Sequence, residues 1–200
     1  KEVKAIIALR GGWGCARMLP FIDMSFISDN TKIISGFSDI TTLLLALYAK
    51  TGLVTFHGPV GNSTWEGATT ENFLSVVQDA ELPFIMSNPE IRTIHPGYAK
   101  GVLLGGNLSI ICSLIGTGFL PDFKNSILFL EETEEEPYRV DRLLTQLEQN
   151  NILNNLAGVV FGTCAKCEPE EPEKSFTLDQ VLDHHFKNRN YPVIKGFAIG

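Results

Sequence analysis

The sequence predicts an α/β fold, in which a lobe built on a parallel sheet is followed by a second, smaller α/β lobe. Short apolar runs such as residues 5–9 and 32–35 end in glycine-bearing turns, and helix-forming segments follow them. Strands that alternate with helices in this way are typical of a parallel sheet with helices on its faces. The length of 200 residues is enough for one large domain or two small ones.

The first lobe is expected to cover residues 1–80. Each of its strands is a short apolar run, and Gly52 is expected to cap the helix before the third strand. We expect buried strands over residues 5–9 and 32–35, a third strand over residues 53–56, and helices over residues 16–22, 41–50 and 70–80.

A connection over residues 81–99 and a second lobe over residues 100–200 are expected next. The connection carries three prolines without a sustained hydrophobic period, which favours a linker over a helix or strand. In the second lobe we expect strands over residues 101–104, 126–130, 157–162 and 192–194, helices over residues 108–115, 138–149 and 178–188, and a solvated acidic loop over residues 168–174.

Composition narrows the classes of function. Apolar residues make up 44% of the chain, and 16 Lys and Arg against 23 Asp and Glu give a net charge of −7. An acidic chain without a basic stripe is a poor nucleic-acid binder and a poor ligand for anionic membranes. No apolar run approaches the roughly 18–20 residues of a membrane span. Because four cysteines without regular spacing do not make a disulfide framework, we expect free thiols in a reducing cytoplasm.

Two glycine-bearing turns of the first lobe are candidates for chemistry. In Gly36-Phe37-Ser38-Asp39, a serine lies between a strand and a helix, where free backbone N–H groups can bind an oxyanion. On this tetrapeptide alone the favoured interpretation is an N-cap, with Ser38 or Asp39 capping the following helix. The turn Arg10-Gly11-Gly12-Trp13-Gly14 follows the neighbouring strand and can supply a second oxyanion donor. A plain tight turn and a phosphate cradle are its alternatives.

Glu131 is the candidate carboxylate of the second lobe. It directly follows an apolar strand, so it is expected at the buried strand end, where a carboxylate needs a partner such as a catalytic histidine. The next acids, Glu132, Glu134, Glu135 and Glu136, are expected to be solvated.

The histidines and the cysteine pair give weaker signals. His57 follows a strand and is interpreted as a structural turn residue rather than a base, and His184 and His185 lie in a charged helix where both are expected to be exposed. Cys164-Ala165-Lys166-Cys167 lacks the second ligand pair that a zinc site requires, so we expect structural or incidental thiols and no metal.

Taken together, these motifs resemble the LD-carboxypeptidase family of serine peptidases, which includes muramoyl-tetrapeptide carboxypeptidases and microcin-immunity peptidases. The resemblance implies a flavodoxin- or amidotransferase-like first lobe and a Ser-Glu-His triad without metal or cofactor. It rests on five segments in the family's order: Ala8-Leu9-Arg10-Gly11-Gly12-Trp13-Gly14, Gly36-Phe37-Ser38-Asp39-Ile40-Thr41, Thr55-Phe56-His57-Gly58-Pro59, Gly105-Gly106-Asn107-Leu108-Ser109, and residues 127–132 with Pro137-Tyr138-Arg139-Val140-Asp141-Arg142.

The resemblance assigns a role to each candidate residue. It implies Ser38 as nucleophile, Glu131 as the triad carboxylate, and the backbone N–H groups of Gly12 and Asp39 as oxyanion donors. Trp13, beside the oxyanion turn, is expected either in the wall of the substrate site or in the core, with equal weight.

The triad histidine is expected outside this sequence. In the family it follows a G-x-x-x-G pattern, which Gly196-Phe197-Ala198-Ile199-Gly200 fits up to its last position. The family also has a strand-helix stretch before its R-G-G turn, so we expect a fragment that is inactive, or nearly so, on its own.

The implied reaction removes a terminal D-amino acid from an L,D-linked muropeptide during cytoplasmic cell-wall recycling. A homodimer is a further expectation from the family. Two alternatives stay open: hydrolysis of a peptide-nucleotide or another acylated small molecule, and a catalytically silent module whose glycine turns hold an anion.

Overall fold

The computed structural model describes residues 2–78 and 91–199 of the chain. The chain forms two compact units, of which unit 1 comprises Lys1–Met86 and Gly116–Pro121 and unit 2 comprises Ser87–Ile115 and Asp122–Gly200. Each unit contains a sheet whose strands are largely parallel, with helices packed against it, which confirms the α/β fold class. Among the described residues, no helix has the length and apolar character that a membrane crossing would require.

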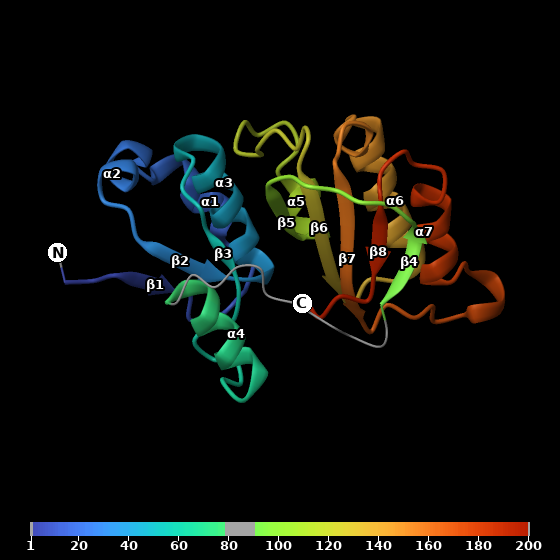
Figure 1. Cartoon of the computed structure of the whole chain (residues 1–200), viewed down its shortest axis with the longest axis horizontal. Helices are drawn as coiled ribbons and strands as arrows, with labels where there is room; N and C mark the ends of the chain where they lie inside the picture. Colours follow the sequence, from blue (N-terminus) through green and yellow to red (C-terminus); the bar gives the residue numbers. More distant parts are fainter. Residues whose placement is uncertain (1, 79–90, 200) are drawn as a thin grey trace. The chain divides into compact units, whose positions relative to one another are not determined.

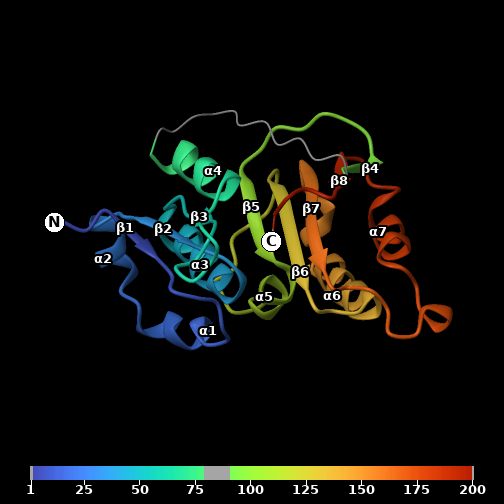
Figure 2. The same cartoon turned by 90° about the horizontal axis from the view of Figure 1, so that it is seen from below.

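Unit 1 is built on a parallel sheet of three strands. The strand order is β1-β2-β3, and in both views α4 lies on the opposite side of this sheet from α1 and α3 (Figures 1 and 2). The elements are β1 (Ala5–Ile7), α1 (Cys15–Met18), η1 (Leu19–Phe21), α2 (Met24–Asp29), β2 (Ile33–Gly36), η2 (Ser38–Ile40), α3 (Thr41–Thr51), β3 (Phe56–His57) and α4 (Ala68–Val77), where η denotes a 3₁₀ helix.

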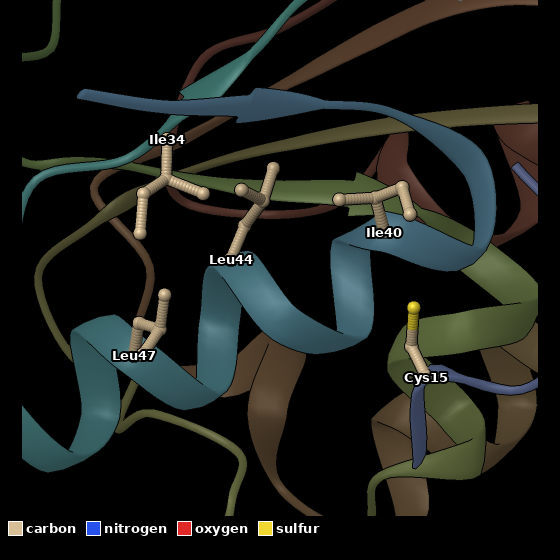
Figure 3. Packing of buried hydrophobic residues seen from close by; sticks show 5 residues of the cluster. All are labelled: Cys15, Ile34, Ile40, Leu44 and Leu47. Atoms are coloured by element: carbon tan, nitrogen blue, oxygen red, sulfur yellow. The ribbon is translucent and has the colours of Figure 1, made fainter. Parts of the chain in front are cut away.

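The buried core of unit 1 lies between β2 and α3. Ile34 on β2 faces Leu44 and Leu47 on α3, while Ile40 and Cys15 extend the cluster toward the start of α3 (Figure 3). Residues 43–47 of α3 are five consecutive apolar residues, so the helix carries apolar side chains on several faces, and Leu44 and Leu47 are those that pack with Ile34.

The outer strand and the end of α3 test two expectations for unit 1. Gly52 adopts a left-handed conformation with φ of 71° and its N–H donates to the carbonyl of Tyr48, so the predicted helix cap is confirmed. The prediction that the first strand is buried is wrong, since Ile6 and Ile7 of β1 are 50% and 40% exposed. Within the described residues β1 pairs only with β2, which leaves β1 at the edge of the sheet.

Unit 2 contains a sheet of five strands in the order β4-β8-β7-β6-β5, in which only the β4–β8 pair is antiparallel. Helices α5 and α6 lie on the same face of this sheet, and α7 packs beside α6 (Figures 1 and 2). The elements are β4 (Arg92–His95), β5 (Leu103–Asn107), α5 (Leu108–Ser113), β6 (Ile127–Thr133), α6 (Pro137–Gln149), η3 (Ile152–Asn154), β7 (Gly158–Ala165), η4 (Pro172–Lys174), α7 (Leu178–Phe186) and β8 (Val193–Lys195).

Two features of unit 2 differ from the sequence prediction. Strand β4 lies in the segment expected to be a connection, most of whose remaining part, residues 81–90, lies outside the described residues. Strand β6 continues to Thr133 instead of ending at Leu130, so that Glu131 and Glu132 are strand residues. The end of β6 therefore carries two acidic side chains into the interior of unit 2.

Candidate active site

Ser38 occupies a strained turn directly after β2. Its φ is 59°, a left-handed conformation that residues other than glycine rarely adopt, and its side chain is half-buried. The preceding Gly36 is required by space, because a Cβ there would lie 2.7 Å from Cγ2 of Ile40. The chain therefore turns sharply out of β2 and presents the Ser38 hydroxyl at the start of η2, as a nucleophile turn does.

The glycine turn after β1 lies against Ser38. A Cβ placed on Gly11 would be 3.1 Å from both Cβ and Oγ of Ser38, so the backbone of this turn passes close to the hydroxyl. Gly12 has a φ of +153°, a conformation that L side chains rarely adopt, and a Cβ there would meet no atom within 4 Å. The serine turn after β2 and the glycine turn after β1 are thus neighbours within unit 1.

The Asp39 side chain ties these two turns together. Its Oδ2 accepts hydrogen bonds from the backbone N–H groups of Gly14, at 2.7 Å, and Cys15, at 3.0 Å. The N-cap interpretation of Ser38 and Asp39 is wrong, since neither η2 nor α3 has a side-chain cap. Asp39 instead holds the start of α1, because its carboxylate is aimed across at the glycine turn rather than along its own helix.

The nearest thiol is not a competing nucleophile. Burial and the neighbouring Asp39 raise the pKa of Cys15 to about 11. A thiol with that pKa is protonated at pH 7, and the thiolate is the reactive form. Ser38 is therefore the better nucleophile of this corner of unit 1.

Trp13 lies on the surface beside the glycine turn. Its side chain is 84% exposed, so the alternative that placed it in the core is wrong. An exposed indole offers a large apolar face to a ligand, so a place in the wall of a substrate site stays a prediction.

His57 occupies an apolar corner next to the Ser38 turn. It lies on β3 opposite Gly36 of β2, and its ring meets that of Phe37 edge-on at 6.3 Å between centroids. Burial lowers the pKa of His57 to about 4, so the imidazole is neutral at pH 7. A general base works best when its pKa is near the working pH, so this histidine does not suit that task.

Glu131 lies in unit 2, in the interior at the end of β6. It is 4% exposed and stands opposite Asn107 in the parallel pairing of β5 with β6. Burial and the adjacent Glu132 raise the pKa of Glu131 to about 7, and a hydrogen bond from the side chain of Asn107 opposes that shift. Within the described part of the chain, its Oε1 is buried and has no hydrogen-bond partner.

Glu132 was expected to be solvated, and that expectation is wrong. Its side chain is 4% exposed and accepts four hydrogen bonds, from Nδ2 of Asn107, from N and Oγ of Ser109, and from N of Thr133. The pairing of β6 with β7 is irregular between Leu130 and Glu132. No signal in the acidic run separates Glu132 from Glu134, which is exposed, or from Glu135 and Glu136, which are half-buried. The partners of Glu132 include Asn107 and Ser109, which follow Gly105-Gly106 in the sequence. These polar residues are the sequence feature that comes nearest to indicating a buried Glu132.

Two further expectations for unit 2 are corrected. Cys164 and Cys167 form a disulfide at the end of β7, so they are not free thiols, whereas Cys15 and Cys112 are free and buried.

His185 is expected to be exposed but is only 4% exposed, because the face of α7 that carries it packs against α6. Its Nε2 lies 2.8 Å from Oδ1 of Asp141. In residues 2–78 and 91–199, no three or more His, Cys, Asp or Glu side chains are grouped to hold a metal ion.

Models of known protein families match two segments of the chain. The model of the LD-carboxypeptidase N-terminal domain matches residues 1–58, and the model of the LD-carboxypeptidase C-terminal domain matches residues 100–200. Among curated relatives, a probable murein peptide carboxypeptidase of Bacillus subtilis is 38% identical over 204 residues, which cover 100% of this chain and 64% of the relative. The chain thus spans about two thirds of the length of that relative.

Two solved structures of similar proteins match nearly the whole of this chain. A muramoyltetrapeptide carboxypeptidase from Oxalobacter formigenes matches with a TM-score of 0.85 and 29% identity, covering 100% of this chain and 70% of the other. The structure of MccF in complex with glutamyl sulfamoyl guanosine matches with a TM-score of 0.83 and 25% identity, covering 98% of this chain and 68% of the other.

Proposed function

Since the chain belongs to the LD-carboxypeptidase family, we propose that it is the part of a serine-type carboxypeptidase that carries the nucleophile and the triad carboxylate. The proposed reaction hydrolyses an L,D-peptide bond and releases the terminal D-amino acid of a muropeptide. The observation that carries this proposal is the Ser38 turn, where a strained serine after a parallel strand has a glycine turn packed against its hydroxyl.

In the proposed mechanism the Ser38 hydroxyl attacks the carbonyl carbon of the scissile amide. The carbonyl oxygen becomes an oxyanion, which the backbone N–H groups of Gly12 and Asp39 stabilise. The N–H of Asp39 lies in the first turn of a helix, where N–H groups lack intrahelical acceptors. At Gly12 a Cβ would meet no atom within 4 Å, so the backbone there is open to a ligand. The general base passes the proton taken from Ser38 to the amide nitrogen, the C–N bond breaks, and the D-amino acid leaves as an amine. Water, deprotonated by the same base, then hydrolyses the acyl-enzyme, and the proton returns to Ser38.

Glu131 is assigned the orienting role. A carboxylate that accepts a hydrogen bond from a histidine holds the tautomer that can deprotonate the serine, and it stabilises the imidazolium that forms. The buried Oε1 of Glu131, which has no hydrogen-bond partner in the described part of the chain, supports this assignment because such an oxygen is costly unless a donor reaches it.

The general base is assigned to a histidine outside these 200 residues. Three of the histidines in the sequence have other surroundings that argue against them: the pKa of His57 is too low, the ring of His185 is held by Asp141, and Nδ1 of His95 lies 3.2 Å from the carbonyl oxygen of Lys187. His184 is exposed on α7, and its ring meets that of His185.

The decisive experiment uses the full-length protein and the variant Ser38→Ala. Hydrolysis of an L,D-linked tetrapeptide should fall by roughly 10⁴–10⁶-fold, as in other enzymes that lose a catalytic serine. A serine-reactive probe should label the wild type at Ser38 and leave the variant unlabelled. The matched control is Ser25→Ala, because Ser25 is an exposed serine of the same unit whose hydroxyl donates to Asp23. Turnover retained in Ser38→Ala would reject the serine mechanism.

A second candidate substrate class follows from the similarity to MccF, whose structure contains glutamyl sulfamoyl guanosine. In this alternative the same serine chemistry acts on an aminoacyl nucleotide or another acylated small molecule. The ratio of kcat/KM for an L,D-tetrapeptide to that for an aminoacyl sulfamoyl nucleoside separates the two. A ratio well above one supports the muropeptide, and one well below one supports the alternative. Absence of both turnover and probe labelling would favour a silent binding module.

A further inference from the structure

Glu132 is buried and fully hydrogen-bonded next to the proposed triad carboxylate, yet the mechanism above does not use it. We propose that Glu132 is a positioning residue, which anchors the end of β6 to the start of α5 so that Glu131 is presented with one carboxylate oxygen open to a donor. This inference rests on the proposed function and deepens it by adding a residue that acts through Glu131.

The anchor consists of hydrogen bonds from two elements. Oε1 of Glu132 accepts from Nδ2 of Asn107 at 3.0 Å and from N of Thr133 at 3.0 Å, while Oε2 accepts from N and Oγ of Ser109 at 2.9 Å and 2.7 Å. Asn107 is itself held, because its Oδ1 accepts from N of Ile110 as the N-cap of α5. The carboxylate of Glu132 therefore has fixed donors on both oxygens, and bonds of this charge-assisted kind are strong.

The effect of this anchor falls on Glu131 through the backbone. The two glutamates are consecutive residues of β6, and Asn107, which binds Glu132, is also the residue opposite Glu131 in the β5–β6 register. A carboxylate that orients a catalytic base must keep its direction, and supporting hydrogen bonds are what fixes such a group in place. Oε1 of Glu131 has no hydrogen-bond partner in the described chain, and the Asn107 side chain that hydrogen-bonds the Glu131 carboxyl group is itself bonded to Glu132. The direction of the Glu131 carboxyl group therefore depends on the anchor at Glu132.

The negative charge of Glu132 also acts on its neighbours. It raises the pKa of Glu131, and it contributes to the rise in the pKa of Cys112 on α5 to about 12. On the β7 side the residue in register with Glu132 is Cys164, which is in the disulfide and does not titrate. Removing the charge of Glu132 therefore lowers the pKa of Glu131. Since Glu131 and the catalytic base titrate as a coupled pair, the pH at which kcat/KM falls on the acid side then moves to a lower value.

Three variants of the full-length enzyme separate the anchor from the charge. Glu132→Gln keeps the size but can accept on only one side, so either the Asn107 or the Ser109 bonds are lost. Glu132→Asp keeps the charge but shortens the reach. Ser109→Ala removes one donor and leaves β6 intact. The control is Glu134→Gln, which removes an exposed charge of the same acidic run whose partner is Lys166.

For Glu132→Gln we expect kcat to fall by about 10-fold to 100-fold, the range seen when supporting hydrogen-bond partners of a functional group are lost, with KM changed less than about threefold. The acid limb should move to lower pH. Glu132→Asp should lower kcat without moving that limb, Ser109→Ala should lower kcat by less than Glu132→Gln, and Glu134→Gln should match the wild type. Kinetics are measured well below the unfolding midpoint of each variant.

Two results would overturn the positioning role. One is wild-type kcat and an unshifted pH profile in Glu132→Gln, and the other is a lower unfolding midpoint with unchanged kinetics of the folded enzyme. If Glu132→Gln does not fold, Glu132→Asp and Ser109→Ala decide by the same readings. A parallel Glu131→Gln assay separates the two proposals: wild-type turnover there rejects the triad itself, whereas an inactive Glu131→Gln beside a normal Glu132→Gln rejects only the anchor.

Discussion

The Ser38 turn of unit 1 and the Glu131 strand end of unit 2 are held in different ways. At Ser38 the position of the side chain is fixed mainly by the backbone. The serine is left-handed, and the glycine at position 36 cannot be replaced by a larger residue without displacing Ile40. At Glu131 the backbone is a regular strand pairing with β5, and side chains supply the constraint, above all the carboxylate of Glu132. Substitutions at the first site should act through conformation, and those at the second through charge and hydrogen bonding.

After the loss of Ser38 itself, the largest expected effect is on catalysis at the Glu131 end. For Glu131→Gln in the full-length enzyme we expect kcat to fall by roughly 10³–10⁴-fold, by analogy with the loss of a triad carboxylate, because the amide no longer stabilises the imidazolium. Steady-state hydrolysis of the L,D-tetrapeptide measures it. Wild-type turnover in this variant would show that Glu131 takes no part in the reaction.

The next prediction concerns Asp39, whose side chain links the Ser38 turn to the glycine turn. Asp39→Ala leaves the N–H groups of Gly14 and Cys15 without their acceptor, and we expect it to lower the free energy of unfolding by about 3 kcal/mol. Denaturant unfolding monitored by circular dichroism measures the loss. The matched control is Asp23→Ala, an exposed N-cap of α2 whose removal should cost less than the removal of Asp39. Equal losses in the two variants would show that Asp39 is an ordinary cap.

The third prediction concerns pH and sharpens the description of the Glu131 end. The pKa of Glu131 is about 7 in the folded chain and ordinarily 4.5, so between these values the folded state keeps a proton that the unfolded state has lost. The stabilisation that the proton on Glu131 gives the folded state is present in full below pH 4.5. It is lost as the pH rises to about 7, by at most about 3 kcal/mol.

Urea unfolding of the wild type and of Glu131→Gln between pH 4 and 8 checks this prediction, with the buffer range chosen around both pKa values. The difference in unfolding free energy between the two proteins should change across that window in favour of the variant at high pH. A constant difference would mean that Glu131 titrates as an exposed acid does, contrary to its burial.

The smallest expected effect concerns the disulfide next to the Glu132 register position. Reduction of Cys164–Cys167 opens a loop with a sequence separation of only three, so we expect a loss of about 2 kcal/mol, less than for a long loop. Unfolding with and without dithiothreitol measures it. The double variant Cys164→Ser/Cys167→Ser should not respond to the reductant. A response in that variant would point to another thiol.

The sequence predicts the parts of this molecule that depend on local patterns. The helix after Ser38, its cap at Gly52 and the buried character of Glu131 follow from an apolar run, a glycine signal and a position directly after a strand. The exposure of β1 could not be predicted in this way, because burial of a strand depends on what covers it. Strand β4 was missed because prolines surround a short strand that gains its pairing from β8.

The errors at the site have one physical cause, which is that polar partners lie far away in the sequence. Asp39 reads as a cap until the structure shows its bonds to N–H groups 24 and 25 residues earlier. Glu132 reads as one more solvated acid until Asn107 and Ser109 are placed beside it, 25 and 23 residues earlier. A local pattern specifies which side chains are present, whereas the tertiary fold decides which donors reach them.

The link that Asp39 makes between the serine turn and the glycine turn has a consequence for protein engineering. One carboxylate bonded to two backbone groups of the other turn makes the pair a single module. Grafting the serine loop alone onto another parallel-sheet scaffold would leave that carboxylate without its donors and the loop free to relax. A transplant that keeps the strained conformation must carry both loops and the strands β1 and β2 that space them.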